Sequence, residues 1–382
     1  MDFELSEEQR MIRDMVREFA QAEIAPIAHD IDESGEFPHD IYEQMGKLGL
    51  MGLPFPEKYG GAGADTVSYA LAVEEIAVAS GSVALTYAAH VSLGSAPIYM
   101  FGTEEQKERY LVPLATGEGL GAFALTEPHT GSDAAALKTT ATRDGDEWVL
   151  DGQKMWITSG AVARSIVVAA TTDPEAGTHG VANLIVPAGT PGFTPGKDEP
   201  KMGLKGSVTN QLFFENCRVP AANLLGQEGE GFKQFMITLD GGRISIAAMA
   251  LGLGRAALEK ALEYAHERRA FGKAIAEFQA IQWKLADMAT ELEAARLLIY
   301  KAARMKDEGK GFTKEAAIAK LFASEAADRA CWEAIQIHGG MGYSREIPVE
   351  RYYRDNRLTL IGEGTSEIMR LIIAREILKK GN

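Results

Sequence analysis

The stretch EWVLDGQKMWIT, residues 147–158, decides the fold class of this 382-residue chain. Its two halves are rich in the β-branched and aromatic residues that favour strands, and Asp151-Gly152 between them is typical of a tight hairpin turn. Further strand-like stretches, separated by prolines and glycines, occur at 165–173, 181–189 and 210–220. The segment from about 120 to 222 is therefore predicted to form a small β domain.

Both flanks of this segment show the apolar spacing of helices. On the N-terminal side, Ser6 and Gln9 fit an S-x-x-Q capping box. Helical patterns follow at 40–49, 66–80, 82–100 and 104–116. After a linker at 224–232, longer helical patterns run at 230–266, 277–308, 313–338 and 364–379. Their short links predict an antiparallel four-helix bundle.

The expected fold class is α+β, in the order α, then β, then α. The predicted parts are an N-terminal helical domain (1–120), a middle β domain (121–225) and a C-terminal four-helix bundle (226–382). A chain of this length is expected to divide into two or three packed domains.

Charge and composition argue against several classes of protein. The net charge of −15 and the pI of about 5.1 disfavour a nucleic-acid partner. The chain has no run of about 18 apolar residues, so no membrane span is expected, and the acidic start is unlike a targeting peptide. Cys217 and Cys331 form no C-x-x-C pair, which argues against a disulfide framework or a zinc site. We expect a reduced, cytoplasmic location.

Several motifs fit familiar sites only in part. GLGRAA (252–257) resembles a dinucleotide fingerprint, but it lies in a helical pattern with no strand before it, which favours helix packing. GLKGSVT (203–209) lacks Walker A spacing, and no strand precedes the glycines of 54–66. Glu263 and His266 form one E-x-x-H where a di-iron site needs two, so no metal is expected.

Three other stretches are candidates for a binding or catalytic site. LTEPHTGSD (125–133) and WITSG (156–160) combine hydroxyls, backbone N–H groups and a buried-looking tryptophan, which together suit a flat polar heterocycle. An ordinary loop and a core tryptophan explain the same patterns. In IGEGTSEIMR (361–370), Glu363 stands between two glycines. This pattern fits either an exposed turn or a carboxylate that a ligand can approach.

Six motifs occur in an order that resembles the acyl-CoA dehydrogenase family of flavoproteins. They are FGTEEQKERYLVPLATGE (101–118), LTEPHTGSD (125–133), DGQKMWITSG (151–160), RRAFGKAIAEFQ (268–279), IQIHGGMGYSREIPVERYYRD (335–355) and EGTSEIMR (363–370). The resemblance extends from about residue 2 to 380. Within it, LDGGR (239–243) is most similar to the short-chain, butyryl-type members.

The resemblance implies a β-barrel-like middle domain, with FAD bound between it and the bundle of a homotetramer. It implies α,β-dehydrogenation of a short- to medium-chain, straight or branched acyl-CoA to the trans-2-enoyl-CoA, as in fatty acid β-oxidation. Electrons would pass to an electron-transfer flavoprotein. The alternatives are an acyl-CoA oxidase that uses O₂ and, more remotely, a nucleic-acid-binding flavoprotein relative.

The resemblance also implies roles for individual residues. Contacts to FAD are expected from Phe123, Leu125, Thr126, Gly131, Ser132, Trp156, Ile157, Thr158, Thr365 and Glu367. Contacts to the FAD of a neighbouring subunit are expected from Arg268, Phe271, Gln279, Gln336, Ile337, Gly339 and Gly340. Contacts to acyl-CoA are expected from Ser132, Asp240, Arg243 and Gly364.

Glu363 matches the general base of the family. A thioester makes its α-hydrogen weakly acidic, so a carboxylate can remove that proton while the β-hydride moves to the flavin. Burial is expected to raise the pKa of this carboxylate. Some branched-chain members carry the base on the helix that contains LDGGR, but this chain has Gly242 there, which favours Glu363. Gly362 replaces a tyrosine that is common before the base, so an open pocket wall is expected.

Overall fold

The computed structural model describes residues 4–379, so the predicted domain ends at 1–3 and 380–382 lie outside the described residues. The chain begins with a helical part. Its α-helices are α1 (Glu7–Phe19), α2 (Ala28–Ser34), α3 (His39–Lys47), α4 (Thr66–Ala79), α5 (Gly81–Ala89), α6 (Ala96–Phe101), α7 (Glu104–Gln106) and α8 (Val112–Ala115). The predicted capping box is confirmed, because Ser6 and Gln9 each accept the other's backbone N–H through their side chains.

The centre of this helical part is unusually well buried. Every residue of α4 and α5 is buried, so these helices have no solvent face. The helix predicted at 82–100 follows one path, in which a π-helical segment, His90–Ser95, joins α5 to α6. This segment begins beside the first strand, where the Gly121 N–H donates to His90 Nδ1 at 2.9 Å.

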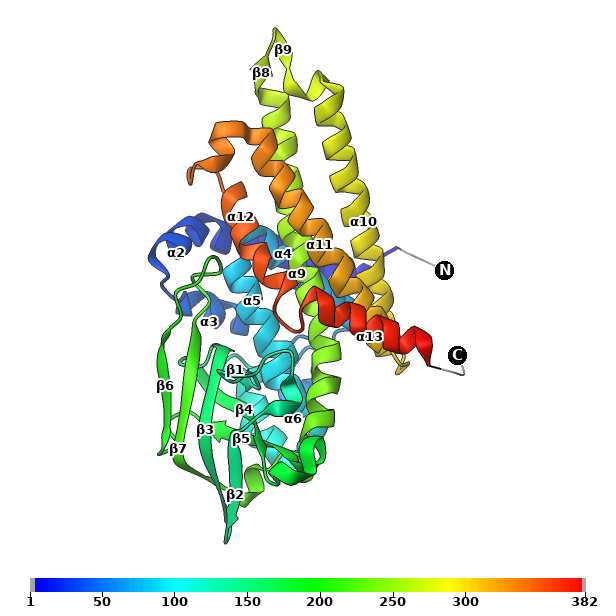
Figure 1. Cartoon of the computed structure of the whole chain (residues 1–382). Helices are drawn as coiled ribbons and strands as arrows, with labels where there is room; N and C mark the ends of the chain where they lie inside the picture. Colours follow the sequence, from blue (N-terminus) through cyan, green and yellow to red (C-terminus); the bar gives the residue numbers. More distant parts are fainter. Residues whose placement is uncertain (1–3, 380–382) are drawn as a thin grey trace.

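The middle part is a seven-stranded sheet (Figure 1). Its strands are β1 (Leu120–Ala124), β2 (Thr140–Asp144), β3 (Glu147–Thr158), β4 (Ala163–Thr171), β5 (Val181–Pro187), β6 (Phe193–Asp198) and β7 (Thr209–Pro220). The strand order is β1-β4-β2-β3-β7-β6, and β5 pairs with β4. β1, β2 and β6 were not expected from the sequence. Trp148, Leu150 and Phe214 belong to the core that the sheet encloses.

The prediction of a hairpin turn at Asp151-Gly152 is wrong. β3 continues through this dipeptide and pairs with β7 on both sides of it. Gly152 has φ +147° at a β-bulge, and Asp151 Oδ1 accepts the Asn216 N–H at 2.7 Å. The hairpin lies one step earlier, between β2 and β3, where Gly145 has φ +59°. β2 and β7 both offer backbone partners to β3, so the strand gains more from continuing than from turning.

The C-terminal part is again helical. It contains α9 (Gly231–Glu267), α10 (Gln279–Asp307), α11 (Thr313–His338), α12 (Val349–Asn356) and α13 (Ser366–Leu378), with a two-stranded hairpin of β8 (Arg269–Ala270) and β9 (Lys273–Ala274) between α9 and α10. Gly339, with φ +60°, ends α11 as predicted. α9, α10 and α11 pack on one another, and α4 of the helical part packs against α9 and α10.

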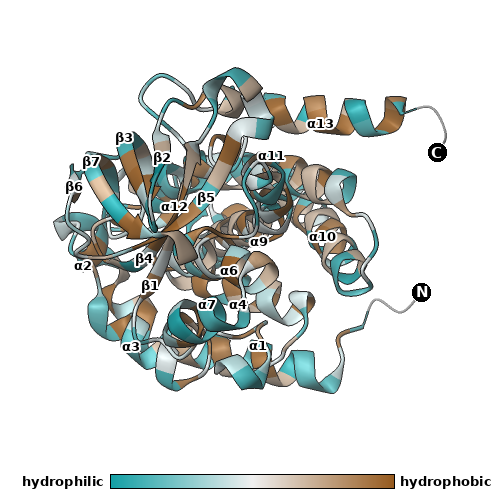
Figure 2. Ribbon diagram, turned by 90° about the horizontal axis from the view of Figure 1, so that it is seen from below, coloured by the Kyte–Doolittle hydropathy of each residue, from teal (hydrophilic) through white to brown (hydrophobic). Residues whose placement is uncertain are grey.

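The predicted fold class is confirmed, but α13 differs from a fourth bundle helix. It packs on α11 and extends away from the other helices in both views (Figures 1 and 2). Figure 2 also shows the sheet on one side of α9, with α10 and α11 on the other side. The change from helix to strand falls between residues 115 and 120, and the change back falls between 220 and 231. The domain limits at 120 and 225 stay predictions.

α9 is the central helix of the molecule. By length and composition it could cross a membrane, with a mean hydropathy of 1.3 over its most apolar window, but 72% of that window is buried inside the protein. The GLGRAA motif lies in this helix and serves close packing, as predicted. A Cβ at Gly252 would lie 2.4 Å from the Glu74 carbonyl oxygen, and one at Gly254 would lie 2.6 Å from Leu292. The apolar length of α9 is therefore that of a core helix.

Candidate active site

Glu363 lies in a strained turn between α12 and α13. Gly362 N–H donates to the Leu358 carbonyl oxygen at 2.8 Å, which closes the first half of the turn. Glu363 then adopts φ +55° and Gly364 φ +100°. Left-handed backbone is costly for a residue with a Cβ, so other contacts must hold Glu363 there. Thr365 ends the turn as the N-cap of α13, where its Oγ1 accepts the Ile368 N–H at 3.3 Å.

This turn aims the Glu363 carboxylate into the protein, onto the surface of α9. Oε2 is buried and has no hydrogen-bond partner among the described residues, although part of the residue is exposed. A Cβ built on Gly242 would lie 2.3 Å from Oε2 and 2.9 Å from Leu93 Cδ2. Gly242 is therefore needed because the carboxylate occupies the space that any side chain there would fill.

Two cations set the charge state of this carboxylate. Burial raises the pKa of Glu363 to about 7, while Lys320 and Arg243 act in the opposite direction. Lys320, on α11, is fully buried and donates to the Gly364 carbonyl oxygen at 2.7 Å. The result is a carboxylate that is partly ionised near neutral pH and has no competing hydrogen bond. Such a group can accept a proton from a ligand.

Asp240 and Arg243 form an i, i+3 ion pair on α9, on either side of Gly242 in the sequence. Arg243 is 4% exposed and pairs with Asp240 Oδ1 through its Nη1. Thr313 Oγ1 donates to Asp240 Oδ2 at 2.6 Å, which ties the pair to α11. Burial raises the pKa of Asp240. Arg243 Nε is buried without a partner among residues 4–379, so it remains available as a donor.

The loop predicted to hold the flavin is attached to the sheet by a buried ion pair. Lys154 Nζ donates to Glu127 Oε1 at 2.7 Å and to the Leu125 carbonyl oxygen at 3.1 Å. Glu127 also accepts the backbone N–H groups of Lys138 and Thr139, at 2.7 and 2.9 Å. Burial lowers the pKa of Lys154 to about 8. Burial alone would raise the pKa of Glu127, but Lys154 and the hydrogen bonds from Thr139 together lower it, so both groups stay charged at neutral pH. This pair was not predicted from the sequence, although a lysine inside an apolar strand is a usable signal.

The structure places the predicted flavin residues of the β domain around the ends of β1 and β3. Trp156 is not a core residue: its side chain is 52% exposed and its φ is +60° at a break in the β3 register. The expectation that Trp156 is buried is wrong, because the break in the β3 register turns its ring outward. Ile157, in contrast, packs inside the sheet core. Phe123 is half-buried, and its ring centroid lies 4.1 Å from that of Phe235 on α9.

Polar groups at these strand ends fit a heterocyclic cofactor. The hydroxyls of Thr126, Ser132 and Thr158 make no hydrogen bond within the part of the chain that the structure describes, although other hydroxyls in the same loop do. Gly131 and Ser132 are exposed, and a Cβ at Gly131 would meet nothing. Free hydroxyls beside an exposed indole ring match the requirements of a flavin, which needs both stacking and hydrogen bonds. Thr365 and Glu367 lie at the start of α13, shortly after Glu363.

The remaining predicted cofactor residues lie at the opposite end of the molecule. Arg268, Phe271 and Gln279 surround the β8–β9 hairpin at the tip of α9, far from the sheet (Figure 1). Phe271 is 96% exposed and has φ +50°. Arg268 follows α9 directly, so it lies about 39 Å along the helix from Gly242 at 1.5 Å per residue. Gln336, Gly339 and Gly340, at the end of α11, are also exposed, whereas Ile337 is buried.

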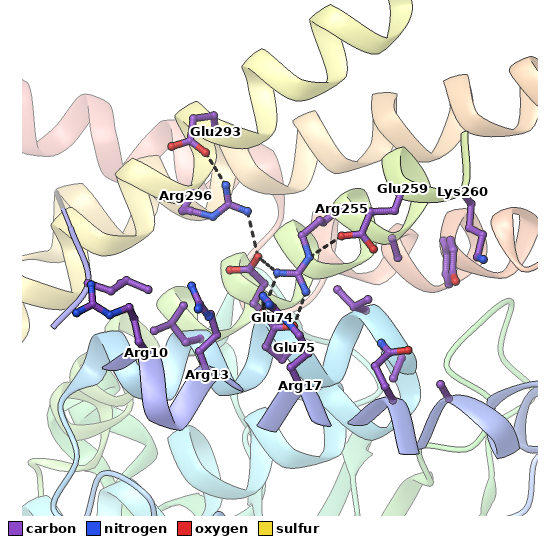
Figure 3. A pocket seen from close by; sticks show the side chains of 18 of the residues that line it. Arg10, Arg13, Arg17, Glu74, Glu75, Arg255, Glu259, Lys260, Glu293 and Arg296 are labelled. Carbon is purple, nitrogen blue, oxygen red and sulfur yellow. Dashed lines mark hydrogen bonds and ion pairs between the residues drawn. The ribbon is translucent and has the colours of Figure 1, made fainter. Parts of the chain in front are cut away.

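A pocket of about 1080 Å³ lies apart from these residues, between α1, α4, α9 and α10 (Figure 3). Its floor is a buried ion-pair network in which Arg255 contacts both Glu74 and Glu75 at 2.6 Å. Arg17 and Arg296 complete the network at 2.8 and 3.1 Å. The acids are matched by the arginines, so the network joins helices rather than awaiting a ligand. Among the described residues, no group of three or more His, Cys, Asp or Glu side chains is arranged to hold a metal.

Family models match almost the whole chain in three consecutive segments. The N-terminal, middle and C-terminal domain models of acyl-CoA dehydrogenase match residues 6–118, 122–217 and 229–378. A probable acyl-CoA dehydrogenase of Bacillus subtilis, YngJ, is 58% identical over 99% of this chain and 100% of its own length. A short-chain specific acyl-CoA dehydrogenase of Clostridium acetobutylicum is 47% identical over 99% and 100%.

Solved structures show the same relationship. Butyryl-CoA dehydrogenase from Megasphaera elsdenii has a TM-score of 0.98 at 48% identity, covering 99% of this chain and 100% of its own. A chain described with the electron transferring flavoprotein of Acidaminococcus fermentans has a TM-score of 0.99 at 49% identity, covering 100% of both chains. Glutaryl-CoA dehydrogenase from Mycobacterium smegmatis, in complex with FADH2, has a TM-score of 0.93 at 34% identity, covering 99% and 96%. This chain thus belongs to the acyl-CoA dehydrogenase family of FAD-dependent oxidoreductases.

Proposed function

We propose that this protein oxidises short-chain acyl-CoA thioesters to trans-2-enoyl-CoA, with Glu363 as the base that removes the α-proton. The observation that carries this proposal is the buried, unpartnered Oε2 of Glu363 beside Lys320 and Arg243. The names of the Clostridium acetobutylicum relative and of the Megasphaera enzyme favour short-chain substrates.

The chain's own residues account for the proton transfer. Glu363 Oε2 faces α9 across Gly242, so a thioester held between this surface and the flavin would bring its Cα within reach. The pKa of about 7 leaves a large fraction of Glu363 ionised at neutral pH, and transfer of the α-proton neutralises its charge. FAD, when bound, supplies the hydride acceptor. Backbone N–H groups near the base are suited to stabilise the negative charge that develops on the thioester oxygen.

Gly242 excludes the alternative position for the base, which lies on the helix that contains LDGGR in some branched-chain members of the family. A glutamate at 242 would need the space that Glu363 Oε2 already occupies. The two arrangements are therefore mutually exclusive, and this chain has the one with the base in the turn before α13. Arg243, held by Asp240, lies next to Gly242 and is proposed to order the thioester end of acyl-CoA. Ser132 and Gly364 complete the proposed acyl-CoA contacts.

We also propose that a complete FAD site needs two copies of the chain. Phe123, Thr126 and Trp156 lie at one end of the molecule and Arg268 and Phe271 at the other, so a single chain cannot bring both groups to one cofactor (Figure 1). α13 extends from the body and exposes Leu371, Ile377 and Leu378 by 51%, 66% and 76%, as expected of a surface that a partner covers. A homotetramer, with an electron-transfer flavoprotein as the electron acceptor, is the assembly that we propose.

Anaerobic addition of acyl-CoA thioesters tests the activity. Butyryl-CoA should bleach the flavin absorbance of wild type within seconds, and Glu363→Gln should bind FAD but remain yellow. Admitting air afterwards separates the two reaction types, since an oxidase would regain its colour at once and a dehydrogenase would need an electron-transfer flavoprotein or a dye. If no acyl-CoA bleaches the wild-type flavin, the proposed function is wrong.

A further inference from the structure

Lys320 is a buried cation with very few partners. It is 0% exposed, and its Nζ makes one hydrogen bond, to the Gly364 carbonyl oxygen at 2.7 Å. No carboxylate among residues 4–379 forms an ion pair with it. Burying an ammonium group without an ion pair is expensive, so a lysine is retained at such a place only when its charge or its donor has a use.

The position of this lysine indicates what that use is. The Gly364 carbonyl belongs to the peptide group that follows the two left-handed residues, Glu363 and Gly364. By binding this oxygen from α11, Lys320 fixes the C-terminal end of the turn, and the Leu358 carbonyl, which accepts Gly362 N–H, fixes its N-terminal end. The turn is therefore held at both ends, and the base projects from its middle.

The charge of Lys320 also acts on the base. Of the two cations beside Glu363, Arg243 is largely neutralised by Asp240, whereas Lys320 has no such counter-ion. Burial lowers the pKa of Lys320 to about 8, so it remains mainly charged at neutral pH. Besides Glu363, the charged groups that act on Lys320 are Arg243, Glu367 and Glu325, and Tyr69 of α4 is a further titratable group near Glu363.

We propose that Lys320 is a positioning residue for the reaction: its ammonium group anchors the turn that carries Glu363, and its positive charge keeps that carboxylate ionised. This inference rests on the proposed function, in which Glu363 must be ionised before it can take the α-proton. It assigns to α11 a role in catalysis beyond that of a packing helix.

The test compares the holoenzymes of Lys320→Met and Lys301→Met. Methionine matches the length of lysine without its charge or donor. Lys301, on α10, is 60% exposed and lies 3.8 Å from Glu315. Glu315 also pairs with Lys314 at 3.4 Å, so it retains a partner when Lys301 is replaced. Lys301→Met is therefore the matched control for the loss of a lysine charge. Flavin reduction by butyryl-CoA is followed anaerobically by stopped flow between pH 6 and 9. In parallel, a 3-thia-acyl-CoA, which can lose its α-proton but has no β-hydrogen to transfer, reports ionisation of the bound ligand without turnover.

We expect Lys320→Met to retain FAD, to reduce it at least tenfold more slowly at pH 7, and to need a pH about one unit higher for half-maximal rate. The pH at which half of the bound 3-thia ligand is ionised should rise together with the pH of half-maximal rate. Lys301→Met should match wild type in both measurements. A slower rate with an unchanged pH profile would show a merely structural role and overturn the inference. An unchanged rate would also overturn the inference.

A second variant, Lys320→Gln, provides the test if Lys320→Met does not fold. Lys320→Gln is smaller and keeps an amide donor, so it should fold and show the same upward displacement of the pH profile. Failure of both variants to fold would assign Lys320 to global stability and reject its role toward the base. Failure of the proposed function is distinguishable, because then wild type itself would not be bleached by any acyl-CoA.

Discussion

The turn that carries Glu363 and the β8–β9 tip between α9 and α10 both contain strained backbone, but they place their side chains in opposite surroundings. Glu363 and Phe271 both have positive φ, of +55° and +50°. The Glu363 carboxylate points inward to a buried place that Lys320, Gly242 and Leu358 define within one chain. Phe271 points outward and is 96% exposed, with a T-shaped contact to Phe278 at 6.1 Å.

This difference shows which parts of the site one chain completes. Strain that contacts within the same chain hold in place fixes the Glu363 carboxylate in one position before any ligand binds. Strain at an exposed aromatic residue is not compensated within the chain, so its reason must lie in a ligand or a second copy. The position of Glu363, the proposed base, is therefore preformed, whereas the cofactor site is proposed to depend on assembly. The following predictions test the two ends of this comparison.

The largest effect is expected from Glu363→Gln. Glutamine keeps the shape and loses the proton acceptor, so flavin reduction by butyryl-CoA should slow by about 10²–10⁴-fold or more. FAD content should be unchanged. A stopped-flow rate within tenfold of wild type would show that another group is the base.

The same variant should change the pH dependence of stability. The pKa of Glu363 is raised from its usual 4.5 to about 7 in the folded state, so its contribution to stability is full below pH 4.5 and is lost as pH rises through 7. Glu363→Gln has no such loss. Its melting temperature should exceed that of wild type at pH 8 by roughly 2–4 °C, with a smaller difference at pH 5. Calorimetry at the two pH values measures this.

The ion pair between Lys154 and Glu127, under the loop proposed to hold the flavin, is the next most sensitive element. Lys154→Met leaves Glu127 charged and buried, which should cost about 3–5 kcal/mol of folding free energy and release FAD. Lys154→Met combined with Glu127→Gln removes the unpaired charge and should be markedly more stable than Lys154→Met alone. Urea titrations of the three proteins, with bound FAD measured by absorbance, decide this. Equal stability of the single and double variants would contradict the pairing.

Gly242→Ala tests how exactly the base must be placed without altering any charge. The added methyl group would lie 2.3 Å from Oε2, so Glu363 must move. A misplacement of about 1 Å can cost on the order of 10²-fold in rate. Gly241→Ala is the matched control, because its Cβ would only approach Lys306 at 3.7 Å. Equal rates for the two variants would argue against the observed position of the carboxylate.

At the other end of the molecule, Arg268→Ala should weaken FAD binding and assembly together. Loss of a charged hydrogen bond to the cofactor of a neighbouring copy is expected to weaken FAD affinity by about 10–100-fold. Arg218→Ala, an exposed arginine on β7 paired with Asp144 and Glu147, serves as the control. Light scattering with FAD titration measures both properties. A fully assembled, fully yellow Arg268→Ala protein would reject the two-copy site.

The smallest effect is expected at Gly362. A Cβ there would meet Leu358 at 3.5 Å, which is ordinary contact, and the side chains of Tyr87 and His90 are held elsewhere by Leu50, Met51 and Gly121. An open wall should admit an extra methyl or a small ring. At about 0.8 kcal/mol per methylene, Gly362→Tyr should shift preference from isobutyryl- or cyclohexanecarbonyl-CoA toward butyryl-CoA by up to about tenfold. Unchanged kcat/KM ratios would show that the wall is not open.

The sequence by itself determined the order of helical and β parts, because local periodicity and turn residues report local conformation. Ser6 with Gln9 marked the start of α1, and Gly339 marked the end of α11. The motifs also identified the family and singled out Glu363, because a glutamate between two glycines belongs to a stretch whose order along the chain is specific.

Only the tertiary structure decided what depends on neighbours distant in sequence. Asp151-Gly152 became a bulge because β2 and β7 both pair with β3. Trp156 turned outward at a register break, and Lys154 paired with Glu127 across 27 residues of chain. Lys320 reached Gly364 from another helix, 44 residues away in sequence. Burial and charge at a point in space are sums over such neighbours, so the pKa of Glu363 follows from packing rather than from the sequence around it.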